Sequence, residues 1–177
     1  SEWLINYQGG FTRRGIIGEI CFQLASFFNV SLRFVIFLFQ STLYLVYLIL
    51  IYFFIKNTAK NTLIIIAIFS PIFLLYPVAE LEVLARKEVF LYAGFILFLN
   101  ISSFKHSNNA PLIYIFFIFP ILCLIWEPFI FFFSFAFFVI LIRNNKDTLK
   151  KIIFKIFLSF SSSILTMSII LLNLLTP

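Results

Sequence analysis

The chain has 177 residues, of which 63% are hydrophobic and 21% aromatic, with 28 Phe, and only 11% are charged. A soluble domain carries charge on about 25% of its residues, so this composition excludes an ordinary soluble protein. The apolar runs approach the bilayer length and do not alternate with period two, which argues against a transmembrane barrel. We therefore predict an all-α fold, a polytopic transmembrane helical bundle with five or six membrane segments and an N-terminal interfacial helix.

The supply of reactive side chains excludes several kinds of site. Cys21 and Cys123 lie far apart in apolar sequence, and we interpret both as small buried hydrophobic residues. His106 is the only histidine and Asp147 the only aspartate, so neither a Ser-His-Asp triad nor a histidine-rich metal site can be built. The net charge of +6 comes from basic residues at the ends of apolar runs. We predict no metal, no cofactor and no nucleic-acid partner.

The first elements in chain order are an amphipathic helix and a span. The sequence starts at Ser1 and stops directly after an apolar run, so we expect one integral membrane domain, 1–177, that is a piece of a longer protein. Within 15–28, apolar residues recur with helical spacing while Glu19, Gln23 and Ser26 share the other side, which indicates an interfacial helix. The run 31–55 is long enough to cross a bilayer.

The middle of the chain is broken by prolines and by one charged segment. The run 62–79 contains Pro71 and Pro77, which tend to kink a membrane helix. The charged segment 80–88, with the sequence ELEVLARKE, separates it from a third run, 89–104.

The interval 111–142 allows two interpretations because Glu127 lies at its centre. A single helix of about 32 residues would be about 48 Å long, well beyond a hydrocarbon core of about 30 Å. A hairpin of two short segments, 111–126 and 128–142, places Trp126, Glu127 and Pro128 at a membrane surface, where such residues suit a turn. Counting positive residues alone favours the single helix; the segment lengths and Glu127 favour the hairpin, which we predict.

The last membrane segment, 156–175, follows the basic segment 143–155. Ser159 and Ser163, and likewise Ser162 and Thr166, are small residues four apart, a spacing typical of close helix packing. In both topologies the segments GGFTRRG, 9–15, and ELEVLARKE, 80–88, lie on the same side of the membrane.

The shared side predicts a site for an anionic ligand. Arg13 and Arg14 lie at the start of a helix, where cations oppose the helix dipole and a bound anion would offset the cost. Arg86 and Lys87 share this side in both topologies, and with the hairpin Glu127 shares it too. Other interpretations stay open: the arginines bind lipid headgroups, Glu82 and Arg86 form a salt bridge at a solvated helix end, and Glu127 is a turn residue.

The segment GGFTRRGIIGE before the first long span, the later RKE that leads into a span, and the acidic residue of WEP resemble bacterial envelope polysaccharide polymerases, the Wzy-like O-antigen and exopolysaccharide group. The resemblance implies a multi-pass protein of the inner membrane that joins sugars carried on polyprenyl pyrophosphate at the outer face. It implies pyrophosphate or acidic-sugar binding by Arg13, Arg14, Arg86 and Lys87, and a catalytic base at Glu127 or Glu82. The chain is too short for the usual number of spans and lacks the large periplasmic loop of that group.

Two further classes of function stay open beside a lipid-linked glycosyl transfer enzyme. Proline-broken helices suggest a transporter or flippase, although no inverted repeat is visible. The small-residue faces would suffice for a non-catalytic assembly subunit. A multi-span polyprenyl-phosphate glycosyltransferase is a variant of the first class, and Glu19 is its best candidate for an acidic residue in an early outward loop. Membrane lipids are the expected partners in every case.

Overall fold

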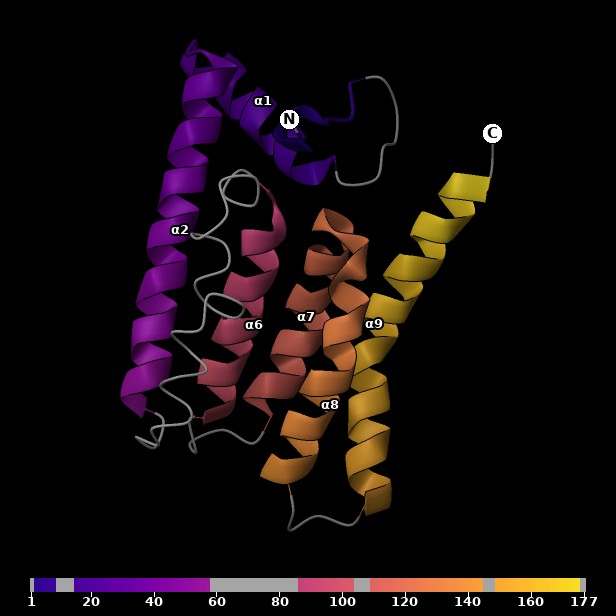
Figure 1. Ribbon diagram of the computed structural model, residues 1–177. Coiled ribbons are helices and arrows are strands. Elements are labelled where there is room, and N and C mark those ends of the chain that lie inside the picture. Colours follow the sequence, from indigo (N-terminus) through magenta and orange to yellow (C-terminus); the bar gives the residue numbers. More distant parts are fainter. Residues whose placement is uncertain (1, 9–14, 58–85, 104–108, 145–148, 176–177) are drawn as a thin grey trace.

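The computed structural model describes residues 2–8, 15–57, 86–103, 109–144 and 149–175, and within these ranges all regular structure is helical (Figure 1). The predicted all-α class is therefore confirmed. The elements in chain order are η1 (Glu2–Leu4), α1 (Ile16–Phe28), α2 (Leu32–Asn57), α6 (Glu88–Ser103), α7 (Ala110–Ile125), η2 (Glu127–Phe131), α8 (Phe132–Arg143) and α9 (Leu149–Leu175). The predicted segment 62–79 and the residues Arg13, Arg14 and Glu82 lie outside the described residues.

Two helices are long and apolar enough to span a membrane, at Leu32–Lys56 in α2 and Lys150–Leu172 in α9. Only 11% of the best window in α2 and 28% of that in α9 is buried inside the protein, so their apolar side chains mostly face outward. The core helix of a soluble protein would be buried, whereas outward-facing apolar helices suit a lipid environment. The predicted spans 31–55 and 156–175 correspond to these two helices.

The helix α9 begins at Leu149, seven residues before the predicted segment 156–175. Ile152 and Ile156 are buried on one face, whereas Lys150, Lys151 and Lys155 are exposed on the other. The basic turn therefore continues the helix instead of preceding it, because its apolar face packs while its lysines stay in water.

The helices between these two spans are shorter. The helices α6 and α7 have 16 residues each, which makes each about 24 Å long at 1.5 Å per residue. The helix α8 has 12 residues and is about 18 Å long. A hydrocarbon core is about 30 Å thick. Among the described residues, two helices thus have the length and composition of a membrane span. The sequence predicted five or six membrane segments for the whole chain.

The chain reverses direction between α7 and α8, at the position of Glu127 (Figure 1). Trp126 is extended, with φ −158° and ψ 113°, and ends α7. Pro128 is the second residue of the short helix η2, where its missing N–H and fixed φ suit a first turn. The interval 111–142 is therefore a hairpin and not one long helix, with η2 inserted before α8 where the sequence predicted a single segment, 128–142.

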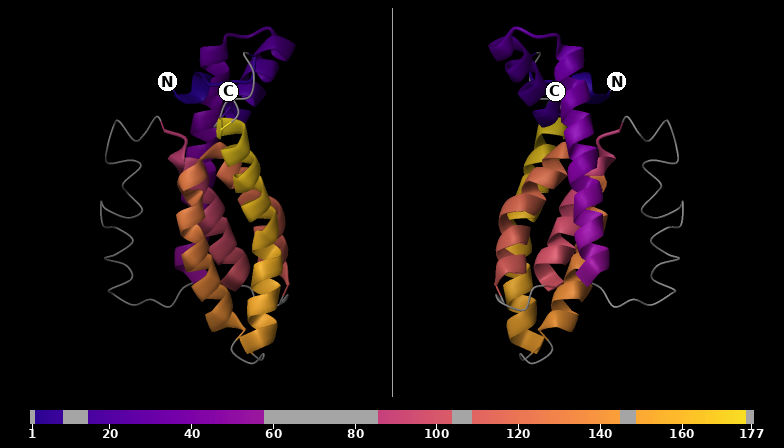
Figure 2. Two further views of the ribbon diagram at one scale, coloured as in Figure 1. Left: turned by 90° about the vertical axis from the view of Figure 1, so that its right-hand side faces the viewer. Right: turned by 90° about the vertical axis from the view of Figure 1, so that its left-hand side faces the viewer.

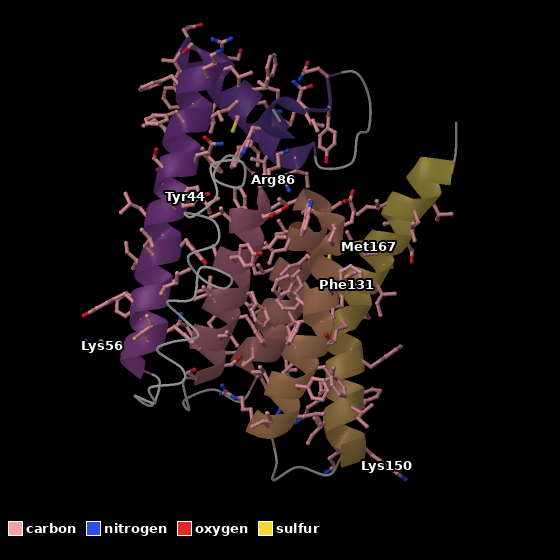
Figure 3. All side chains as sticks on the ribbon, in the orientation of Figure 1. Tyr44, Lys56, Arg86, Phe131, Lys150 and Met167 are labelled. Atoms are coloured by element: carbon pink, nitrogen blue, oxygen red, sulfur yellow. The ribbon has the colours of Figure 1, made fainter. Side chains whose placement is uncertain are left out.

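The bundle has two ends of different chemistry (Figures 1 and 2). The α1 end consists of η1, α1, the starts of α2 and α6, η2, and the last turns of α7 and α9. The opposite end, here called the basic end, carries Lys56, Arg143, Lys150, Lys151 and Lys155. Figure 3 shows the labelled Arg86 at the first end and the labelled Lys56 and Lys150 at the second.

The core of the bundle is built from phenylalanine rings and close helix contacts. Phe119 of α7 lies 4.8 Å from Phe129 and 5.6 Å from Phe98 between ring centroids. A Cβ added to Gly94 of α6 would lie 2.5 Å from a methyl group of Leu122 of α7, so the missing side chain lets these two helices approach. These contacts fix α6, α7 and η2 relative to one another, and thereby position the residues at the α1 end.

The small residues of α9 pack closely against α7, as their spacing of four predicted. Ser163 is fully buried, and the hydroxyl of Ser162 donates a hydrogen bond of 2.7 Å to the backbone carbonyl of Phe116 in α7. Small side chains permit this approach because they leave room for the neighbouring backbone.

Candidate functional site

The α1 end is covered by α1 together with the N-terminal segment, residues 2–8 (Figure 2). Trp3 is only 1% exposed, and its ring centroid lies 5.8 Å from that of Phe90 in α6 and 6.5 Å from that of Phe39 in α2. An aromatic ring buried in this way contributes several kcal/mol, about 3–5 by comparison with aromatic-to-alanine changes. Trp3 therefore fastens the N-terminal segment to the α2–α6 pair.

The N-terminal segment also lies directly on α1. A Cβ built on Gly18 would stand 1.9 Å from the carbonyl oxygen of Ile5, a distance that no side chain can occupy. Glycine at this position is what allows the two backbones to touch.

Glu19 fixes the same contact through hydrogen bonds. Its Oε2 accepts from the backbone N–H of Tyr7 at 3.1 Å, and its Oε1 accepts from the amides of Gln8 and Gln23 at 2.9 and 3.0 Å. Burial, followed by the nearby Glu19 carboxylate, raises the pKa of the Tyr7 hydroxyl. Glu19 therefore holds α1 and residues 2–8 together; these two segments are called the cover. This role is additional to the one expected for an acidic residue in an outward loop.

Lys87 lies beneath this cover, just before the first turn of α6. Its side chain is 0% exposed, among the most buried in the protein. It is close to Cys21 on the inner face of α1: burial raises the pKa of the Cys21 thiol, and the Lys87 ammonium group opposes part of that rise. Since a fully buried ammonium group is costly, a lysine here marks a specialised position and not a solvated helix end.

Arg86 stands beside Lys87 but is accessible, with its side chain 49% exposed. Its guanidinium forms an ion pair of 3.4 Å with Glu88, whose side chain is 15% exposed. The sequence predicted a salt bridge between Arg86 and Glu82, but Glu82 lies outside the described residues. Among the described residues, the partner of Arg86 is Glu88. An exposed pair of this kind is worth about 0–1 kcal/mol, so Arg86 can exchange Glu88 for an anionic ligand at little cost.

Glu127 opens η2 at the same end of the bundle, and its Oε1 atom is shielded from solvent. Gly94 of α6 lies against Leu122 of α7, which sets the two helices level with each other. Lys87 is seven residues from Gly94 toward the α1 end, and Glu127 is five residues from Leu122 in the same direction. Both residues lie just beyond the ends of their helices, Lys87 before α6 and Glu127 after α7. The hairpin thus brings Glu127 to the same end of the bundle as Lys87.

The ends of α6 and α7 lie deeper than the ends of the two long helices. The rings of Phe39 and Phe90 are 5.9 Å apart, which sets α2 level with α6. Seven residues of α2 precede Phe39, but only two residues of α6 precede Phe90. The start of α2 therefore lies about 8 Å beyond the start of α6. The C-terminal turns of α9 also extend past α7 (Figure 1). The charged residues therefore lie below the level that the ends of α2 and α9 reach, at the end of the bundle that α1 covers.

The structure places three of the residues expected to form a site, Arg86, Lys87 and Glu127, at one end, and describes none of Arg13, Arg14 and Glu82. Within the part of the chain that the structure describes, no group of three or more His, Cys, Asp or Glu could hold a metal. The arrangement offers chemistry of two kinds: binding of an anion by Arg86 and, after movement of the cover, by Lys87, and acceptance of a proton by Glu127.

Sequence reasoning missed Trp3 and Asn100. Trp3 belongs to no long apolar run, and only its large aromatic side chain signals an anchor. Asn100 was the one amide within the run 89–104, and a buried amide in a membrane segment is a signal of helix pairing. Its side-chain amide donates to the carbonyl of Leu50 in α2 at 3.1 Å and to that of Ile96 at 3.0 Å.

Comparisons of the chain with protein-family models, with curated proteins and with solved structures gave no match.

Proposed function

We propose that the chain belongs to a multi-pass protein of the bacterial inner membrane that transfers or polymerises sugars carried on polyprenyl pyrophosphate at the outer face. The observation that carries the proposal is the placement of Arg86, Lys87 and Glu127 at one end of the bundle, the end that α1 covers. Cations for a pyrophosphate and a carboxylate for an acceptor hydroxyl are the groups that such a transfer requires.

The distribution of charge supports the proposed orientation. Among residues whose side chains the structure describes, the basic end carries five cations and no carboxylate, whereas Glu19, Glu88 and Glu127 all lie at the α1 end. Cytoplasmic ends of membrane helices are enriched in Lys and Arg, so the basic end faces the cytoplasm in this proposal. The α1 end, with the candidate site, then faces outward.

In the proposed reaction, Arg86 leaves Glu88 and binds a phosphate oxygen of the lipid-linked donor. Glu127 accepts the proton of the acceptor hydroxyl as the new glycosidic bond forms and the pyrophosphate leaves. Lys87 reaches the leaving group only when α1 and the N-terminal segment move, since its side chain is fully covered. The cover then excludes water from the reacting groups when it closes again.

The test replaces Glu127 by Gln, which keeps the shape of the side chain and removes its basicity. In the source bacterium, the Glu127→Gln variant should make about 10²–10⁴-fold less polymer than the parent protein, the usual contribution of a general base. Polymer is measured on gels and protein by immunoblot. Glu127→Asp should retain part of the activity.

Lys150→Gln, an exposed cation at the basic end, is the matched control and should leave polymer formation unchanged. Normal polymer from both Glu127→Gln and Arg86→Gln would refute the transfer function and favour an assembly subunit. Lipid-linked sugars that accumulate on the cytoplasmic side in these variants would instead indicate a flippase.

A further inference from the structure

A groove of about 520 Å³ lies between α7 and α9 at the basic end of the bundle, where both helices begin (Figure 1). Among the residues that line it are Asn109, Ile113 and Phe117 of α7 and Lys155 and Leu158 of α9. About one turn beyond Leu158, the hydroxyl of Ser162 donates a hydrogen bond of 2.7 Å to the carbonyl of Phe116 and joins the two helices. The groove therefore lies on the basic side of this contact, far from the candidate site.

A cation forms part of the wall of the groove. Lys155 lines it directly, on the same face of α9 as Leu158. Lys151 lies four residues before Lys155, so it shares that face one turn nearer the basic end, and both side chains are exposed. Lys150 lies five residues before Lys155, which places it on the other side of α9. Because like charges four residues apart on a helix repel each other, an anion beside Lys151 and Lys155 would stabilise this turn.

The directions of the helices also favour an anion at this groove. The helices α7 and α9 begin at the basic end, whereas α2, α6 and α8 end there. The first turn of a helix presents N–H groups and partial positive charge, and the last turn presents carbonyl groups. Asn109 precedes α7, and its side chain forms no capping hydrogen bond with the helix. Lysine charge and helix dipoles thus act in the same direction at the groove.

A second pocket at the basic end has a different character. It has a volume of about 460 Å³ and is lined by residues of α2, α6 and α8, among them Arg143. The guanidinium of Arg143 donates hydrogen bonds to the backbone carbonyls of Ile101 and Ser102 in the last turn of α6. This arginine therefore caps the end of a helix. The second pocket provides an internal comparison for the α7–α9 groove.

The remainder of the groove suits hydrocarbon. Ile113, Phe117 and Leu158 are exposed apolar side chains, and α9 has the length of a membrane span. Eight residues separate Asn109 from Phe117, which correspond to about 12 Å along α7. This length is close to half of a hydrocarbon core of about 30 Å, the part that one leaflet provides. A phosphate at the lysines and an acyl chain along the wall would match both parts of the groove.

We propose that the α7–α9 groove binds one anionic phospholipid, with its phosphate on Lys151 and Lys155 and an acyl chain against Ile113, Phe117 and Leu158. Basic pockets between membrane helices bind anionic headgroups in this way. A zwitterionic headgroup fits less well, because it brings its own ammonium group close to the lysines. The leaflet concerned is cytoplasmic in the orientation proposed above. Binding itself requires no sugar transfer, so this proposal and the proposed function succeed or fail separately.

The test measures retained lipid by native mass spectrometry of the full chain, extracted into mild detergent from nanodiscs that contain phosphatidylglycerol and phosphatidylcholine in equal amounts. The parent protein should retain phosphatidylglycerol in preference to phosphatidylcholine. Lys155→Gln should lower the ratio of the two retained lipids about fivefold, which corresponds to about 1 kcal/mol for one lysine near a lipid phosphate. Lys150→Gln removes the same charge from the other side of α9 and should leave the ratio unchanged.

The groove itself is tested with a matched pair of exposed isoleucines. Ile113→Trp fills the groove and should lower retention of phosphatidylglycerol about tenfold, as expected when roughly two methylene groups of the acyl chain lose their contacts. Ile142→Trp, in the wall of the second pocket, should leave retention unchanged. A photoreactive benzoylphenylalanine in place of Phe117 should give a phospholipid adduct, a result that does not depend on tryptophan being tolerated.

Four outcomes would each overturn the proposal. They are equal lipid ratios in Lys155→Gln and Lys150→Gln, equal retention in Ile113→Trp and Ile142→Trp, no preference of the parent protein for phosphatidylglycerol, and a benzoylphenylalanine adduct with a second copy of the chain instead of a lipid.

Discussion

Replacing Gly18 by Ala should detach the N-terminal segment from α1. The new Cβ would lie 1.9 Å from the carbonyl oxygen of Ile5 and 3.0 Å from that of Trp3. Both contacts are backbone atoms, so no side-chain rotation can relieve the overlap, and the segment itself must move. Movement of the segment withdraws Trp3 from its place between Phe39 and Phe90.

The size of the effect follows from the overlap. Overpacking of this kind costs about 1–3 kcal/mol. Since each 1.4 kcal/mol is a factor of ten, the population of molecules with an open cover should rise about 5- to 150-fold. This change is local opening and need not lower the stability of the helices beneath.

The assay uses Cys21 as a reporter of opening. Its thiol is 0% exposed on the inner face of α1, and burial raises its pKa, so in the closed state it should react very slowly with a maleimide at neutral pH. With Cys123 replaced by Ala, the rate of Cys21 labelling in detergent at pH 7 measures the open fraction. Gly18→Ala should increase this rate by the factor given above.

Gly94→Ala is the matched control because it makes the same substitution within another helix. Its Cβ would meet only the flexible end of Leu122, between α6 and α7. Cys21 labelling should stay at the parent rate in this variant. An unchanged rate in Gly18→Ala, or an equal increase in Gly94→Ala, would refute the role of Gly18 in closing the cover.

The contacts of Lys87, Cys21 and Asn100 give three further predictions. Lys87→Met should shift the pH profile of Cys21 labelling to higher pH, because in the parent protein the Lys87 ammonium group lowers the pKa of that thiol. An unchanged profile would show that the two groups do not interact. Because the pKa of Cys21 is raised above its ordinary value of 9.0 in the folded state, closure of the cover should be strongest below about pH 9 and weaken as pH rises further. With Trp126 replaced by Phe, quenching of Trp3 fluorescence by iodide would detect this opening. Asn100→Leu should lower the free energy of unfolding in sodium dodecyl sulfate by about 0.6–1.7 kcal/mol, because the α2–α6 pair loses the hydrogen bond to Leu50. Ser168→Ala, on an exposed face of α9, should lower it by much less. Equal effects of the two substitutions would argue against the bridge to Leu50.

Apolar composition and run length were enough to predict the helical class and the two long helices, because lipid-exposed spans must be apolar along their whole length. The hairpin at Glu127 was also predictable, since a single helix would be too long for the hydrocarbon core and would leave a charge near its centre. The depth of Lys87 was not predictable. Lys87 is buried because α1 lies over it, and Cys21 of α1 is 66 positions away from Lys87 in the sequence. No local sequence pattern encodes such a long-range contact.

The same limit applies to Glu19 and Gly18. Both belong to the amphipathic pattern of α1, and the pattern places Glu19 on the polar face. It does not indicate that residues 2–8 will bind that face, because a segment of seven residues is too short to carry a periodic signal of its own. Contacts with residues 2–8, which lie outside the helix, decide these two roles.

The unequal lengths of the helices have a consequence for the membrane itself. A bilayer that fits α2 and α9, each about 39 Å long or more, is too thick for α6 and α7, which are about 24 Å long. Lipids beside the short helices must therefore compress, by about 6 Å relative to a 30 Å core, at a cost of a fraction of a kcal/mol per Å. Thin bilayers reduce this mismatch. The protein should accordingly partition into thinner membrane regions and become less stable as the acyl chains of the host lipids lengthen.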